Sequence, residues 1–492
     1  MINQVKKLCN VIVSNHYYSL LILISLYSFQ LLWLDKIPLV AIDEPWAGNT
    51  AYNVSKGLGF INTNRGMWGG DHLFLMPAIT WVWIKLFGLS LFSIRFASFV
   101  CGIVTIVGWV KICKQLDIKS WVTTLVGSMF ILGNIFFVIF HWGRPESLVC
   151  TLLIWAVYYT IKGISTSWVL LLSSFLLSIG CFAHPHLLAV CIVYALFACA
   201  LAVYKKEWQP IIYSVLGVSV TLCIAWVFIQ LHFESLSIFL SDLTQLSSGR
   251  SYKASTSMGM FFIDNIKQFI VTYCLGWKRS YILFFEIGIL GFGLFQKQYK
   301  SIRYLSLAGL LAFGIGLVMY FFRRRYFGII LIFSYLVLAI LLTVFSKRKN
   351  KKIFYSLIFF TGMYLANNLV GDLYIVYKNR HVEPFYKIEK YLRNHIPQQA
   401  RVYSSLHFWT GLEETIWLRS LAELKSGDYV VLSDLFKQAI SPTTGEKGDV
   451  HNVKDVETAR YNQTVNYINQ NGILLDQKQT NGYGLIQLWK IN

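Results

Sequence analysis

Long apolar runs dominate the first three quarters of the chain. A helix needs about 20 apolar residues to cross the roughly 30 Å hydrocarbon core of a membrane. Runs of about that size lie near 17–34, 92–111, 121–140, 147–161, 167–183, 187–203, 210–231, 280–296, 304–322, 326–346 and 353–370. The pattern predicts a polytopic α-helical membrane protein with about eleven transmembrane helices.

Two further apolar segments, 73–87 and 259–277, decide the topology, because counting just one of them as a span would invert every later loop. Residues 73–87 include a proline, two tryptophans and a lysine. This composition is typical of an amphipathic segment that lies at the level of the lipid headgroups. The second segment contains Asp264 and Lys267. We therefore expect two interfacial helices.

After residue 370 the pattern changes to that of a soluble domain. A helical stretch near 384–395 ends before Pro397. Strand patterns, rich in β-branched and aromatic residues, follow at 401–404, 428–433 and near 483–489. We expect a transmembrane catalytic domain over residues 1–370 and a small α/β domain over residues 371–492.

Composition agrees with this division. The chain of 492 residues is 55% apolar and only 14% charged, whereas soluble domains carry about a quarter charged residues. The net charge is +20. Residues 1–370 hold 30 basic and 11 acidic side chains, and the remaining residues hold 14 and 13. The excess charge therefore belongs to the membrane part, and we expect no nucleic-acid partner.

The basic residues of short loops set the orientation of the spans. With eleven spans, the basic clusters fall on one side: Lys6–Lys7, Lys111–Lys119, Lys162, Lys205–Lys206, Lys297–Arg303 and Lys347–Lys352. That side is expected to be the cytoplasm of a bacterium. The C-terminal domain and the acid-rich loops are then expected outside.

The first outer loop, 35–91, opens with a pair of carboxylates, Asp43 and Glu44, followed by Pro45. One interpretation is a helix N-terminus with Asp43 as its cap. A carboxylate partly shielded from water can also have a raised pKa and act as a general base on a hydroxyl or amine. The two roles are compatible. We take Asp43 as the candidate base and Glu44 as its helper.

The next outer loop is very short and places Arg144 and Glu146 directly between two spans. They form either a substrate-binding pair or a surface ion pair in which the acid caps the next helix. Further along, Arg323, Arg324 and Arg325 lie at the outer end of a span, against the orientation rule. Arginine forks match phosphate oxygens, so they indicate a lipid-linked phosphate. The alternative is contact with ordinary anionic headgroups.

His184 and His186 flank a proline at an outer turn. Two histidines without a nearby acid or cysteine are weak evidence for a zinc site, so no metal is expected. A structural role in the turn around Pro185, or a place in the wall of a substrate cavity, is favoured. Glu286 lies inside a predicted span. Burying an ionisable group in a membrane costs free energy, so such a residue is a candidate functional residue. It lies near the outer end, so it could also reach the interface.

These motifs, in this order, resemble the polytopic GT-C glycosyltransferases of the bacterial family that includes the aminoarabinose transferase of lipid A and the protein O-mannosyltransferases. In that family an Asp-Glu pair opens the first outer loop, as Asp43 and Glu44 do. An acid-Lys-Pro-Pro stretch, Leu-Phe-Gly and a span opening with Arg follow. The corresponding stretches here are Asp71–Pro77, Leu86–Gly88 and Phe92–Arg95.

Further motifs extend the resemblance along the chain. Arg144–Glu146 resembles the family's Arg-Pro-Asp, and Arg325–Tyr326 resembles an Arg-Tyr that opens a late span. The stretch Tyr391–Pro397 before Arg401 resembles the external domain of such enzymes. The sequence departs from the family at His72, which stands where the family has a phosphate-binding lysine.

The resemblance implies an inverting transferase that uses a polyprenyl-phosphate sugar as donor and needs no metal. Asp43 would deprotonate the acceptor. His72, Arg144 and Arg323 to Arg325 would stabilise the departing phosphate. Candidate substrate-binding residues in the same loops are Asp71, Glu146, His184, His186 and Tyr326.

The sequence therefore predicts a glycosyltransferase of the bacterial cytoplasmic membrane, with membrane lipids, a polyprenyl-phosphate sugar and a lipid or surface-glycan acceptor as its partners. Lipopolysaccharide and O-antigen are examples of such acceptors. A protein O-glycosyltransferase is the second hypothesis. A transporter or flippase of lipid-linked sugars and a non-catalytic scaffold are the rivals from other classes. Transporters, however, place ionisable groups at mid-membrane between broken helices, whereas here they collect in outer loops.

Overall fold

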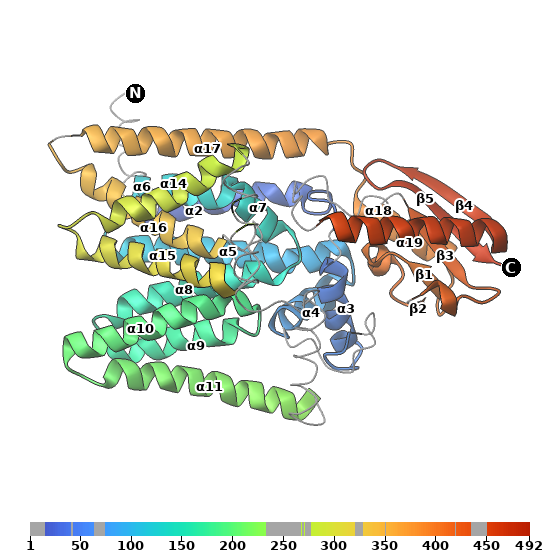
Figure 1. Ribbon diagram of the computed structural model, residues 1–492, viewed down its shortest axis with the longest axis horizontal. Coiled ribbons are helices and arrows are strands. Elements are labelled where there is room, and N and C mark those ends of the chain that lie inside the picture. The colour runs from blue at the N-terminus through green and yellow to red at the C-terminus, as the bar shows by residue number, and fades with distance from the viewer. Residues whose placement is uncertain are drawn as a thin grey trace. The chain divides into compact units, whose positions relative to one another are not determined.

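The computed structural model describes residues 15–40, 43–62, 74–232, 267, 270, 277–319, 328–349, 351–418, 420–433 and 450–492 (Figure 1). The chain divides into two compact units. Unit 1 comprises residues 1–31, 98–140 and 145–372, and unit 2 comprises residues 32–97, 141–144 and 373–492. The C-terminal segment, residues 373–492, thus shares a unit with the first outer loop.

Unit 1 is helical. Its helices are α2 (His16–Ser28), α6 (Ser120–Leu132), α7 (Asn134–His141), α8 (Pro145–Gly163), α9 (Leu170–Gly180), α10 (Leu188–Lys205), α11 (Gln209–His232), α14 (Trp277–Leu294), α15 (Lys300–Met319) and α16 (Gly328–Phe345). Two long helices, α5 (Leu91–Gln115) and α17 (Lys352–Lys378), contribute residues to both units. Helix α16 is apolar and buried on nearly all sides, as expected of a central membrane helix.

Each of the eleven predicted runs contains helix, but the predicted number of spans is not confirmed. In the described ranges, six helices are long and apolar enough to cross a membrane: α5, α10, α11, α15, α16 and α17. Helices α6 and α7 make a seventh span if they are counted as one helix bent by 63°. Helices α2 and α9, with 13 and 11 residues, are too short to be counted as spans. The chain is a polytopic helical membrane protein.

The structure describes the first of the two predicted interfacial segments and very little of the second. Helix α4 (Leu75–Phe87) coincides with the first segment. Its 13 residues span only about 20 Å at 1.5 Å per residue, so it does not count as a span. The second segment, 259–277, lies almost wholly outside the described residues.

Unit 2 contains a five-stranded sheet in the order β2-β1-β3-β5-β4. The strands are β1 (Arg401–Ser404), β2 (Ile416–Leu418), β3 (Tyr429–Ser433), β4 (Gly472–Thr480) and β5 (Gly484–Ile491). Strand β1 pairs in parallel with β2 and β3, and β5 pairs antiparallel with β3 and β4. The three predicted strands correspond to β1, β3 and β5, and the sequence pattern missed the two edge strands.

Helix α18 (Phe385–His395) and helix α19 (Val450–Asn471) cover opposite faces of this sheet (Figure 1). The two faces separate because side chains alternate along a strand. In β3, Val431 packs with α18, whereas Val430 and Leu432 pack with Tyr461 and Ile468 of α19. This arrangement confirms a C-terminal α/β fold.

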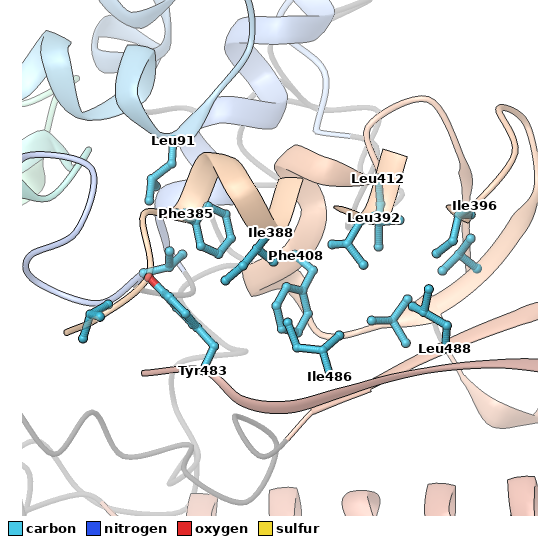
Figure 2. Close-up of a cluster of buried hydrophobic side chains, with 14 residues drawn as sticks. Leu91, Phe385, Ile388, Leu392, Ile396, Phe408, Leu412, Tyr483, Ile486 and Leu488 are labelled. Atoms are coloured by element: carbon cyan, nitrogen blue, oxygen red, sulfur yellow. The ribbon is translucent and has the colours of Figure 1, made fainter. Parts of the chain in front are cut away.

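The core beneath α18 includes residues from the first outer loop. Figure 2 shows Leu91 beside Phe385 and Ile388 of α18, with Ile486 and Leu488 of β5 in the same cluster. Val40 also belongs to this cluster. The apolar face of α18 therefore packs against both the sheet and the first outer loop.

Candidate active site

Helix α3 (Asp43–Ser55) carries the predicted carboxylate pair in its first turn. Acidic side chains at this end are stabilised by the helix macrodipole. The side chain of Asp43 lies outside the described part of the structure, so its role as base remains a prediction. The structure describes Glu44 in full.

Glu44 forms a buried ion pair with Arg95 of α5. Arg95 Nε donates to Glu44 Oε1 at 2.7 Å, and its terminal Nη2 donates to Oε2 at 3.0 Å. A third bond runs from Arg95 Nη1 to the carbonyl oxygen of Leu34, 2.9 Å away. Both side chains have 0% exposure. The buried pair links the first turn of α3 to α5, and the role of Glu44 as helper of the base stays a prediction.

The second outer loop closes on the same pair. The N–H of Gly143 donates to Glu44 Oε1 at 3.0 Å, and the indole N–H of Trp142 donates to the Leu39 carbonyl at 3.2 Å. A Cβ on Gly143 would lie 3.1 Å from the backbone carbonyl of Ile94, which leaves no space for a side chain. The two outer loops predicted to bear the chemistry are therefore brought together.

Arg144 follows at the end of this loop, and its guanidinium lies 5.8 Å from the centre of the Trp142 ring. Its side chain is 8% exposed. Glu146 is also buried, in the first turn of α8, but it belongs to unit 1 whereas Arg144 belongs to unit 2. Arg144 directly follows Gly143, whose N–H donates to Glu44. It is therefore the basic residue next in sequence to this contact.

A further acid, Asp35, lies where the first loop meets α18. Burial raises the pKa of its carboxyl, although Arg95 and the backbone N–H groups of Phe385 and Tyr386 oppose this. The backbone N–H of Phe385 also donates to the Asp35 carbonyl oxygen at 3.4 Å. Asp35 therefore connects the first turn of α18 with the surroundings of Arg95.

The remaining described candidates lie in unit 1. His184 and His186 contact each other through their Nδ1 atoms in the turn Pro185–Leu187, where the His186 N–H donates to His184 Nδ1 at 3.3 Å. The described residues contain no group of three or more His, Cys, Asp or Glu side chains placed to hold a metal ion. Glu286 is 1% exposed and accepts a hydrogen bond from the Tyr364 hydroxyl at 2.8 Å, so it lies inside the bundle and does not reach the interface.

Six predicted site residues lie outside the described residues: Asp71, His72, Arg323, Arg324, Arg325 and Tyr326. Their proposed contacts with the donor remain predictions. The sequence motifs include Arg95 but do not indicate its role. The available signal was its position in an apolar run, since a buried arginine requires an acidic partner.

No family model matches the chain, and no curated protein matches it. Among solved structures, the fold is similar to that of ArnT from Cupriavidus metallidurans bound to undecaprenyl phosphate, with a TM-score of 0.55. The apo structure of the same protein gives 0.56. Each match covers 95% of this chain and 97% of the other at 10% sequence identity. ArnT is the lipid A aminoarabinose transferase, so the resemblance predicted from the motifs is confirmed at the level of the fold.

Proposed function

We propose that this protein is a membrane glycosyltransferase that moves a sugar from a polyprenyl phosphate to a lipid or surface-glycan acceptor. The observation that carries the proposal is the buried assembly in which Arg95 and the N–H of Gly143 hold Glu44 in the first turn of α3, in a chain whose fold is similar to that of ArnT. It fixes the helix that begins at Asp43. The solved ArnT structure with undecaprenyl phosphate supports a lipid-linked donor.

In the proposed reaction the Asp43 carboxylate takes the proton from the acceptor hydroxyl or amine. The acceptor atom attacks the anomeric carbon of the sugar from the face opposite the phosphate. The bond from this carbon to the phosphate oxygen breaks, and polyprenyl phosphate leaves with the electron pair. The configuration at the anomeric carbon inverts.

Arg144 is the described residue that we assign to the departing phosphate, because a guanidinium can form two parallel hydrogen bonds to phosphate oxygens. His72 and the cluster Arg323 to Arg325 are proposed to share this role. No metal ion is assigned to the reaction. The active site and the C-terminal domain are placed on the outer face of the bacterial cytoplasmic membrane, because the basic loops of the helical part face the other way.

The test is transfer by the purified protein in liposomes. Radiolabelled polyprenyl-phosphate sugars are offered with an envelope extract as acceptor, and wild type is compared with Asp43→Asn. We expect transfer by wild type, and a loss of about a hundredfold or more in the variant because a general base contributes this much. Donor binding is expected to persist, since the variant removes charge and little volume.

A second measurement separates this proposal from a flippase. If no donor is consumed, while lipid-linked sugar crosses the bilayer equally well with Asp or Asn at position 43, the proposed reaction is wrong. Transfer to a protein in the extract, rather than to lipid or glycan, would identify a protein O-glycosyltransferase.

A further inference from the structure

Helix α18 of the C-terminal segment carries a buried carboxylate on its otherwise apolar face. Glu389 is 2% exposed and lies among the buried residues Phe385, Ile388 and Leu392. Its Oε1 accepts a hydrogen bond from the backbone N–H of Leu91 at 2.9 Å. Leu91 is the first residue of α5, where backbone N–H groups have no partner inside the helix. Glu389 therefore caps a helix that lies 298 positions away in the chain.

One turn further along α18, Arg393 binds the connection that leads into α5. Its Nη2 donates to the carbonyl oxygens of Leu89 at 3.3 Å and Thr410 at 2.6 Å. The same guanidinium pairs with Glu413, 2.9 Å away. Glu389 and Arg393 thus bind the backbone on both sides of Ser90.

This contact lies one helical turn from the assembly around Glu44. Residues four apart share a helix face, so Leu91 and Arg95 lie on one side of α5. Arg95 in turn holds Glu44 in the first turn of α3. A fixed start of α5 therefore fixes the guanidinium that positions the helix of the candidate base.

A second contact reaches α3 from the same segment. In the 3₁₀ turn Leu406–Gly411, the Trp409 ring lies 6.0 Å from the Tyr52 ring, edge to face at 72°. A Cβ on Gly48 would lie 3.5 Å from Trp409 and would collide with Ile94. Helix α3 is thus held between α5 and this turn, with no space for a side chain at Gly48.

We propose that the C-terminal segment positions the active site, with Glu389 and Arg393 as the positioning residues that fix the start of α5 and, through Arg95 and Glu44, helix α3. The inference rests on the proposed function for its effect on rate. It assigns the segment a different role from an acceptor-binding module, which would bind substrate without holding α3. The buried bond between Glu389 and the first residue of α5 favours the positioning role, because a buried hydrogen bond is costly to break.

The test compares Glu389→Ala with Glu389→Gln, since only the second keeps an oxygen that can accept the Leu91 N–H. Glu383→Ala is the matched control, because Glu383 precedes α18 and pairs with Lys478 on the same segment without a described bond to the first loop. Hydrogen exchange is followed in peptides covering 43–55 and 89–97. Initial rates of sugar transfer give kcat and KM.

We expect faster exchange in both peptides, and a kcat lowered about tenfold to a hundredfold with little change in KM, for Glu389→Ala alone. Misplacement of a catalytic group by about 1 Å costs rate on this scale. Glu389→Gln is expected to stay within about twofold of wild type, because its amide oxygen replaces the lost acceptor. The control is expected to match wild type.

The proposal would be overturned by unchanged exchange in 43–55 for Glu389→Ala, or by a raised acceptor KM at unchanged kcat. Equal loss in the Ala and Gln variants would also overturn it. If wild type transfers no sugar while Glu389→Ala still loosens residues 43–55, the proposed reaction fails and the positioning role stands.

Discussion

At the scale of single residues, the ion pair between Arg95 and Glu44 is the feature on which the site depends. Burying two charges is costly, and their attraction offsets this only when the geometry is good and the remaining donors are satisfied. Here both guanidinium nitrogens that face Glu44 bond to it, and the third reaches a backbone carbonyl. The pair therefore holds α3 and α5 together but tolerates the loss of neither partner.

The first prediction is that Arg95→Met destabilises the protein by about 3–5 kcal/mol, because it leaves the Glu44 carboxylate buried without its counter-charge. Glu44→Gln in the same chain should recover part of this loss, since the neutral amide removes the buried charge. Thermal unfolding in detergent measures both. A melting temperature unchanged by Arg95→Met would contradict the prediction.

The second residue-scale prediction concerns Glu389. Burial raises its pKa from 4.5 to about 7, although the neighbouring Thr410 hydroxyl, the Leu91 N–H and Arg393 oppose the shift and Asp35 adds to it. Below pH 4.5 the carboxyl is protonated in the folded and the unfolded chain. Between pH 4.5 and 7 only the unfolded chain loses its proton, so the free energy of unfolding falls as the pH rises.

The contribution lost over this window is on the order of 3 kcal/mol. Wild type should therefore lose more thermal stability between pH 5 and pH 7.5 than Glu389→Gln, which has no proton to lose. Unfolding temperatures at the two pH values, with Glu383→Gln as control, measure the difference. Equal pH dependence in all three proteins would show that Glu389 does not titrate in this range.

At the scale of elements, a polar side chain of a neighbouring helix accepts hydrogen bonds at the break between α6 and α7. The two helices meet at Gly133 with a bend of 63°. The backbone N–H of Asn134 donates to Asn368 Oδ1 of α17 at 3.4 Å, and the Asn134 side-chain amide donates to the same oxygen at 3.2 Å. Broken helices persist in membranes where neighbours satisfy the freed backbone groups.

We expect Asn368→Leu to destabilise the protein by about 1–3 kcal/mol, the cost of a buried donor left without its acceptor. The adjacent Leu369 is 40% exposed on α17, so Leu369→Ala is the control, with an expected effect near zero. Unfolding in detergent measures both variants. Equal effects would indicate that the bend does not depend on the contact with α17.

At the scale of the whole molecule, the notable feature is that the first outer loop and the C-terminal segment share one hydrophobic core. Val40 and Leu91 are buried among residues of α18 and the sheet. Burying an apolar side chain of this size contributes about 1.5–3 kcal/mol. The C-terminal segment is therefore part of the unit that bears the candidate active site.

The sequence by itself determined the helical membrane part, the α/β fold of the tail, and the resemblance in fold to ArnT. Each depends on local information: the length of apolar runs, the β-branched and aromatic content of β1, β3 and β5, and short motifs such as Asp43-Glu44. The number of spans was not determined, because α2 and α9 occupy apolar runs without being long enough to cross as regular helices. The edge strands were missed because β2 has three residues and β4 exposes Ile473, Leu474 and Leu475.

Only the tertiary structure decided which polar residues meet. Arg95 and Glu44 are 51 positions apart, and Leu91 and Glu389 are 298 apart. No local pattern encodes such pairs, because a carboxylate with the same sequence neighbours could cap a helix, face solvent or bind an arginine. Burial in one shared core selects the partner, since a charged or polar group removed from water must bond to whatever the fold brings within reach.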